Sequence, residues 1–165
     1  MKNILMAFVL VLAPTFVFSA VPAKGLLTQD GVIRGGQTST AFMLTDVRKT
    51  QDQKKKIERV VIDLGSLTGE KFVGVPTYFN AEFKKKQKVL SLDLVQTPGS
   101  KVTEDGLQRL FRNSLAVRSA RITVDPEDKT MNLLFNLKNV KALRVLPVAG
   151  NKTATSKLVI DFVAE

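Results

Sequence analysis

The stretch Leu158-Val159-Ile160-Asp161-Phe162 places large apolar side chains at its first, third and fifth positions, which share one face of an extended chain. Its fourth residue, Asp161, falls on the opposite face. Such alternation is typical of a half-buried strand. Four stretches of this kind between residues 60 and 162 predict a two-sheet β domain or a barrel. The other three are Val60-Val61-Ile62-Asp63-Leu64, Leu90-Ser91-Leu92-Asp93-Leu94 and Leu133-Leu134-Phe135-Asn136-Leu137.

Polar turn segments join these strands to neighbours and predict two hairpins. Asp125-Pro126-Glu127-Asp128 has Asp and Pro at the first two corners of a type I turn, and it follows a strand at 120–124. The polar segment 51–56 in the same way joins a strand at 42–48 to a return strand at 57–64. The turns therefore support an all-β chain.

The order of these motifs recurs, which predicts two structural repeats at roughly 42–95 and 116–163. The segments 71–76 and 143–147 are similar and each precedes the closing strand of its half. Each half is too small to bury a core alone, so we expect a two-sheet sandwich of two pseudo-symmetric repeats. The matching positions are Asp63 with Asn136, Pro76 with Pro147, and Asp93 with Asp161.

One connecting helix is predicted between the two repeats. Thr103 suits the N-cap position, because its hydroxyl can accept a hydrogen bond from the first turn. Acidic residues follow in the first turn and arginines come near the C-terminal end, as the helix dipole favours. We expect this helix to cross one end of the sheets. Its apolar stripe is Leu107, Leu110 and Phe111.

The N-terminus has the order of a secretory signal peptide: a basic start, an apolar run at residues 4–18, and small residues. The small-residue rule favours cleavage after Ser19 over cleavage after Ala20, and cleavage after Ala23 stays open. The apolar run is shorter than the roughly 20 residues that span a bilayer, so a membrane anchor is the weaker alternative. We expect a periplasmic protein with a signal peptide at 1–19, a flexible leader with room for one early strand at 20–40, and a β domain at 41–165.

Composition excludes several kinds of enzyme, because the chain has neither Cys nor His. No thiol nucleophile, Ser-His-Asp triad or His-ligated metal site can be built. Paired carboxylates could serve a glycosidase, and the candidates are Asp63, Asp93 and Asp161. Their positions on the outer faces of strands favour solvated or cross-strand-paired carboxylates instead. We therefore expect no enzyme, no catalytic residue, no metal and no cofactor.

The 25 Lys and Arg residues outnumber the 15 Asp and Glu residues, for a formal net charge of +10. Inside a cell this excess would suggest nucleic acid, but an exported chain meets anionic envelope polymers instead. Two lysine clusters fall in predicted turns, where they either guard sheet edges or form a polyanion-binding rim. A second basic surface, including Arg118, is expected in the other half. The candidate ligand-binding residues are Lys54, Lys55, Lys56, Lys84, Lys85, Lys86, Arg121, Arg144 and Lys157.

Aromatic residues argue against a deep sugar pocket. The chain has no Trp and a single Tyr, Tyr78, so stacking platforms for sugar rings are scarce. The phenylalanines on strand faces and the helical stripe are expected in the core: Phe42, Phe79, Phe83, Phe111, Phe135 and Phe162.

The runs LLFNLK at 133–138, RVLPVAG at 144–150 and KLVIDF at 157–162 resemble the second repeat of the AMIN domain. Residues 60–64 resemble the corresponding strand of its first repeat. This family comprises exported β domains found in front of cell-wall amidase domains and in pilus secretins. The resemblance implies a sandwich of two small pseudo-symmetric sheets in the cell envelope. The zinc amidase of the family has no counterpart here, because the chain contains no His.

Taken with the charge, this resemblance predicts a non-enzymatic module that binds peptidoglycan or localises to the cell wall. Lysine and arginine would contact stem-peptide and sugar-lactyl carboxylates. The alternative is a periplasmic adaptor that recruits an amidase, pilus or secretion component by edge-strand pairing. A β-barrel that carries a lipophilic ligand is a third possibility, but the two-repeat pattern favours a sandwich over such a barrel.

Overall fold

The structure is a computed structural model that describes residues 25–38 and 41–165. The predicted signal peptide at 1–19 lies outside the described residues. The elements, in chain order, are β1 (Gly31–Gly35), β2 (Phe42–Asp52), β3 (Ile57–Ser66), β4 (Phe79–Lys84), β5 (Val89–Leu94), β6 (Gly99–Ser100), α1 (Glu104–Phe111), β7 (Val117–Val124), β8 (Met131–Leu137), β9 (Val140–Val148) and β10 (Ser156–Ala164).

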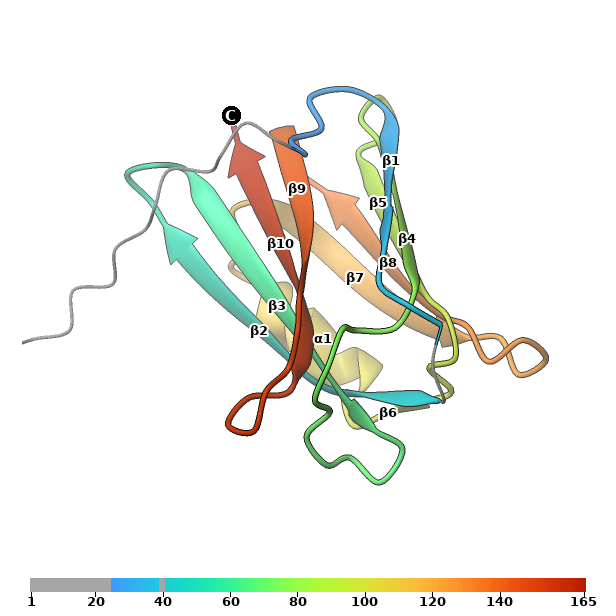
Figure 1. Cartoon of the computed structure of the whole chain (residues 1–165). Coiled ribbons are helices and arrows are strands. Elements are labelled where there is room, and N and C mark those ends of the chain that lie inside the picture. The colour runs from blue at the N-terminus through green and yellow to red at the C-terminus, as the bar shows by residue number, and fades with distance from the viewer. Residues whose placement is uncertain (1–24, 39–40) are drawn as a thin grey trace, which may run out of the picture.

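Two five-stranded sheets pack face to face, which confirms the predicted all-β sandwich (Figure 1). Sheet A has the strand order β6-β2-β3-β10-β9, and sheet B has the order β1-β4-β5-β8-β7. The pairings are antiparallel, except that the two-residue strand β6 runs parallel to β2. The central pair of each sheet joins the two halves of the chain, β3 with β10 and β5 with β8.

The predicted pseudo-symmetry is present, because each repeat gives one hairpin to each sheet. The first repeat supplies β2–β3 to sheet A and β4–β5 to sheet B, and the second supplies β7–β8 to sheet B and β9–β10 to sheet A. The counterparts are β2 and β7, β3 and β8, β4 and β9, and β5 and β10. If each strand of the order β2-β3-β10-β9 in sheet A is replaced by its counterpart, the result is β7-β8-β5-β4, which is the order in sheet B counted from the β7 edge. Asp93 on β5 and Asp161 on β10 accordingly lie on matching strands.

The inward positions of the strands fill the space between the sheets. The six phenylalanines expected in the core are each at most 1% exposed, which confirms that prediction. The ring of Phe135 contacts those of Phe111 and Phe162, at centroid distances of 5.9 and 6.3 Å. Burying one such side chain contributes about 2 kcal/mol.

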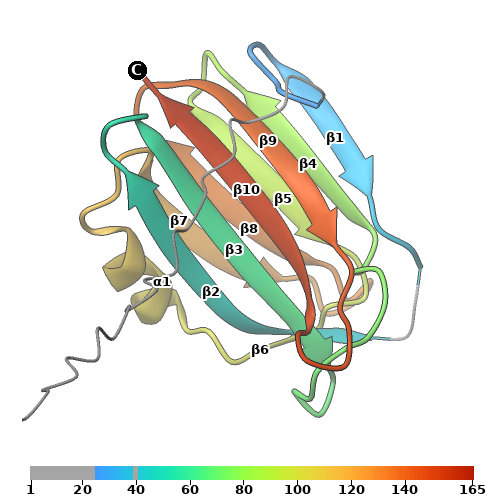
Figure 2. The ribbon, with the colours of Figure 1, turned by 60° about the vertical axis from the view of Figure 1, so that its left-hand side comes forward.

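Helix α1 is capped as predicted, because Thr103 Oγ1 accepts a hydrogen bond from the Gly106 N–H at 3.1 Å. Leu107 and Phe111 are buried. The helix does not cross an end of the sheets. It lies along the side of the sandwich between β7 and β2, where Gln108 Nε2 donates to the Ala120 carbonyl (Figure 2). Within the described residues, no helix has the length and apolar character needed to cross a bilayer.

Two segments differ from the sequence-based expectation. Residues 71–76, expected to match 143–147, form a loop, and β4 is the true counterpart of β9. Gly74 has a φ of 122°, which favours glycine and interrupts a strand. The early strand expected in the leader is β1, which pairs with β4 as an edge of sheet B. The β domain therefore includes described residues that precede residue 41.

Candidate functional site

Four turns or loops lie toward one end of the sandwich, the end that carries the C-terminus in Figure 1. Antiparallel pairing of β3 with β10 and of β5 with β8 brings the hairpin turns of the first repeat beside the β8–β9 turn of the second. The loop that leads into β7 reaches the same end. The four segments are residues 53–56, 85–88, 112–116 and 138–139.

Hydrogen bonds connect these segments, in part through the C-terminal residues Ala164 and Glu165. The Lys56 carbonyl accepts from the Ala164 N–H at 2.9 Å, and the Asn139 carbonyl accepts from the Glu165 N–H at 3.0 Å. Lys88 Nζ donates to Asn139 Oδ1 at 2.9 Å. The two predicted lysine clusters and the β8–β9 turn thus form one continuous surface.

This surface, called the basic end below, carries many more cations than carboxylates. Asp30 Oδ1 accepts from the Lys85 backbone N–H at 2.8 Å, and Asp52 Oδ1 accepts from the Lys55 backbone N–H at 3.0 Å. These carboxylates cap turns and offset only part of the positive charge. The cations of the basic end are Lys54, Lys55, Lys56, Lys85, Lys86, Lys88, Arg112, Arg118, Lys138 and Lys141. Its acidic residues are Asp30, Asp52 and Glu165.

Several of these cations are available to a ligand. Lys54, Lys56 and Lys86 are exposed, and no ion pair involves them within residues 25–38 and 41–165. Lys85 Nζ donates to the carbonyl oxygens of Thr28 at 2.9 Å and Lys141 at 3.3 Å. Carbonyl acceptors fix the position of the ammonium group without neutralising its charge.

In each lysine turn, one lysine has a left-handed backbone conformation that favours glycine. Lys56 and Lys88 have φ values of 52° and 56°, in the left-handed region. A residue with a Cβ pays about 1 kcal/mol there relative to its ordinary conformation. Lys129, in the β7–β8 turn at the opposite end, has the same conformation with φ at 57°. Turn geometry alone would favour glycine at these positions, so each lysine adds charge but lowers stability slightly.

Two β-bulges direct further cations to the basic end. The pairing of β7 with β8 shifts register between Val117 and Ser119, so Arg118 is the extra residue of the bulge. The pairing of β9 with β10 shifts in the same way, and Lys141 is the extra residue there. A bulge bends the strand and re-aims the side chain that it carries. Strand alternation alone predicts neither placement.

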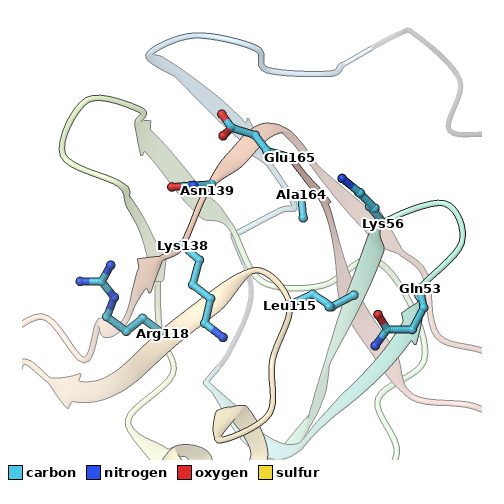
Figure 3. A pocket seen from close by; sticks show the side chains of 8 residues that line it. All are labelled: Gln53, Lys56, Leu115, Arg118, Lys138, Asn139, Ala164 and Glu165. Carbon is cyan, nitrogen blue, oxygen red and sulfur yellow. The ribbon is translucent and has the colours of Figure 1, made fainter.

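A hollow of about 480 Å³ lies within the basic end (Figure 3). Lys56 borders it on one side, and Lys138 and Arg118 border it on the other. Leu115 and Ala164 provide apolar surface, and Lys138 Nζ donates to the Ser114 carbonyl. Cations on opposite sides of an open hollow are suited to an anionic ligand. The remaining lining residues are Gln53, Asn139 and Glu165.

Glu58, which the sequence analysis did not select, holds the loop on which this hollow depends. Its fully buried carboxylate accepts from the Leu115 N–H at 2.7 Å, from Gln51 Nε2 at 2.8 Å and from Ser114 Oγ at 2.5 Å. The signal was available in the sequence. Glu58 shares the inward face of its strand with Val60, where a charged residue needs a specific partner.

The other predicted site residues do not form a second basic surface. Lys84 lies on β4, and its Nζ is 3.2 Å from Glu82 Oε2. Arg121 is exposed on the outer face of sheet B, whereas Lys157 lies on sheet A with Nζ 3.6 Å from Asp63 Oδ1. These residues are separated because β7 and β10 belong to different sheets.

Arg144 is the clearest departure from expectation, because its side chain is buried and paired. Asp161 Oδ2 accepts from Arg144 Nη2 at 2.9 Å, and Asp161 Oδ1 accepts from Arg59 Nε at 2.6 Å. Burial alone would raise the pKa of Asp161, but the hydrogen bonds from Arg59 and Arg144 outweigh it and hold that pKa below its usual value. The cross-strand pairing expected for this carboxylate is therefore present, and Arg144 is not available to a ligand.

Among the described residues, no group of His, Cys, Asp and Glu side chains could hold a metal ion. No protein-family model matches the chain, and neither does any curated protein.

Proposed function

We propose that this protein is an exported, non-enzymatic module of the periplasm that binds an anionic polymer of the cell envelope through its basic end. Peptidoglycan is the first candidate for that polymer. The observation that carries the proposal is the convergence of lysine clusters from both first-repeat hairpins with Arg118, Lys138 and Lys141. Carboxylates on the same surface are few, and two of the three cap turns.

Binding of this kind depends on many weak contacts. One exposed ion pair contributes about 0.2–1 kcal/mol, so no single lysine would hold a ligand. A polymer with repeated carboxylates can engage several cations at once, and its second contact is then intramolecular. Salt screens such exposed charges over about 8 Å at physiological ionic strength, so the affinity should fall as salt is added.

The cell-envelope location is supported by the sequence. The basic, apolar and small-residue order of residues 1–23 is that of a secretory signal. Resemblance to the AMIN domain points to the same compartment. The pseudo-symmetric two-sheet sandwich supports this resemblance, since it is the architecture that the family implies. An absence of His and Cys from the whole chain supports a binding role over catalysis.

An adaptor that works by edge-strand pairing has less support. Leu27 exchanges backbone hydrogen bonds with Leu143 on the edge strand β9, at 2.8 and 2.9 Å. Gln108 of α1 donates to the Ala120 carbonyl on the edge strand β7 at 2.7 Å. The edges at β9 and β7 are thus partly covered, which leaves less backbone there for a partner strand. On the other edge of sheet A, β2 pairs with β6 only at Met43 and Leu44.

Co-sedimentation with purified sacculi tests the proposal. The protein that begins at Ala20 should pellet with sacculi at low salt, and the bound fraction should fall at physiological salt. Failure to pellet at either salt would overturn peptidoglycan binding. Cross-linking to a periplasmic protein without any binding to sacculi would favour the adaptor instead.

A further inference from the structure

A second hollow adjoins the first and is bordered by three arginines. It has a volume of about 510 Å³ and lies between the exposed face of α1 and the start of β7. Arg109 and Arg112 come from α1 and its C-cap, and Arg118 comes from the bulge in β7. Asp105 and Gln108 also line this hollow. Arg118 lines both hollows, so its side chain lies where the two adjoin.

The three arginines are exposed, and no ion pair involves any of them within the part of the chain that the structure describes. Asp105 is the one carboxylate on this hollow, and it lies one helical turn before Arg109. Guanidinium groups present a planar pair of donors that matches a carboxylate, whereas an ammonium group acts as a point charge. The arginine hollow therefore differs in chemistry from the lysine turns beside it.

We propose that the two hollows together form one groove for an extended acidic chain, with carboxylates as the recognised groups. Arg109, Arg112 and Arg118 take one carboxylate in the second hollow, and Lys56 and Lys138 take another in the first. A single small anion would fill only one hollow. This inference rests on the proposed function and specifies which residues of the basic end and of α1 bind the polymer.

The β7 bulge is what makes Arg118 the shared residue. In a regular strand, a side chain at this position would point to one face of sheet B. The extra residue instead lies where β7 leaves the 112–116 loop, beside the arginines of α1. Loop residue Leu115 is anchored by Glu58, which fixes the start of β7 relative to β3.

Binding of hexaglutamate and of an oligogalacturonate of similar length tests the inference. Comparison of the two shows whether the groove prefers peptide or sugar carboxylates. The inference predicts that at least one of them binds and that monomeric glutamate does not. Arg118→Lys keeps the charge but loses the planar donor pair, so it should weaken binding by about tenfold. Arg121→Lys, on the outer face of sheet B, is the matched control and should bind as the unmodified protein does.

Arginine Nε–Hε signals in ¹H–¹⁵N spectra provide a second readout. Those of Arg109, Arg112 and Arg118 should shift together with hexaglutamate or oligogalacturonate, while that of Arg121 stays in place. Equal binding by Arg118→Lys and the unmodified protein, or equal shifts at Arg121, would overturn the arginine groove. If Arg118→Lys still pellets with sacculi under those results, the proposed function stands without the arginine groove. Failure of the unmodified protein to pellet would instead overturn peptidoglycan binding.

Discussion

Lys88 Nζ lies 2.9 Å from Asn139 Oδ1, although the two residues are 51 positions apart and belong to different repeats. An exposed hydrogen bond of this kind adds little stability. Its importance is positional, because it joins the second lysine cluster to the β8–β9 turn. The sandwich thereby turns two separate basic segments of sequence into a single surface.

Asp161→Asn should lower the free energy of unfolding by about 3 kcal/mol, because it leaves Arg144 buried without an anionic partner. Urea denaturation at neutral pH measures the loss. Asp93→Asn is the control on the matching strand of sheet B. Within the described part of the chain, Asp93 accepts side-chain hydrogen bonds only from the amides of Asn80 and Asn132, so its loss should be smaller, about 1 kcal/mol. Equal losses would contradict a special role for the arginine pair.

Asp161 also predicts how stability depends on pH. Its pKa is lower in the folded protein than in the unfolded chain, so the unfolded chain takes up the proton first as the pH falls. The stabilisation is present above about pH 4, near the ordinary pKa of Asp, and is lost as the pH falls below it. Urea denaturation between neutral and acid pH should show a shallower decline for Asp161→Asn. An identical decline in both proteins would show that Asp161 does not contribute.

Lys56→Gly should raise stability and weaken polymer binding at the same time. Glycine relieves the left-handed backbone at this position and gains about 0.5 kcal/mol, after its greater freedom in the unfolded chain is subtracted. Lys129→Gly changes an equivalent turn at the opposite end. It should give the same gain in thermal stability and leave pelleting with sacculi unchanged. Weaker binding by both variants would show that net charge alone matters.

Glu58→Ala should destabilise the protein by about 2 kcal/mol, since it leaves the Leu115 N–H and Ser114 hydroxyl without their buried acceptor. Hydrogen exchange should then speed up at residues 112–116 before it does in β5 or β8. Uniformly faster exchange throughout both sheets would indicate a general loss of stability instead of release of this loop.

Period-two alternation predicted the strands but left a two-sheet domain and a barrel open, and the internal repeat favoured the sandwich. The four stretches around Asp63, Asp93, Asn136 and Asp161 became β3, β5, β8 and β10, and these four strands form the centre of both sheets. Their shared pattern has a physical reason, since central strands bury one face completely. The N-cap at Thr103 could also be predicted, because capping depends on residues that are close in the sequence.

Which residues come together at the basic end could not be predicted from the alternation of apolar and polar residues, because it depends on contacts between distant segments. The sequence analysis identified both lysine turns. That they lie beside Lys138 and Lys141 follows from strand pairing between the two repeats. Arg118 and Lys141 reach the basic end through bulges, which have no sequence signature here. Arg144 was expected among the ligand-binding cations, but its cross-strand neighbour Asp161 draws it into a buried pair.

One comparison tests the role of the basic end most directly. Lys54, Lys56 and Lys86 are changed together to Gln, and the control changes Lys71, Lys129 and Lys152, which are exposed in loops at the opposite end. Both triple variants lose the same charge. Co-sedimentation with purified sacculi at low salt should drop sharply for the first variant and stay at the level of the unmodified protein for the second. Equal pelleting by the two variants would contradict a binding surface at the basic end.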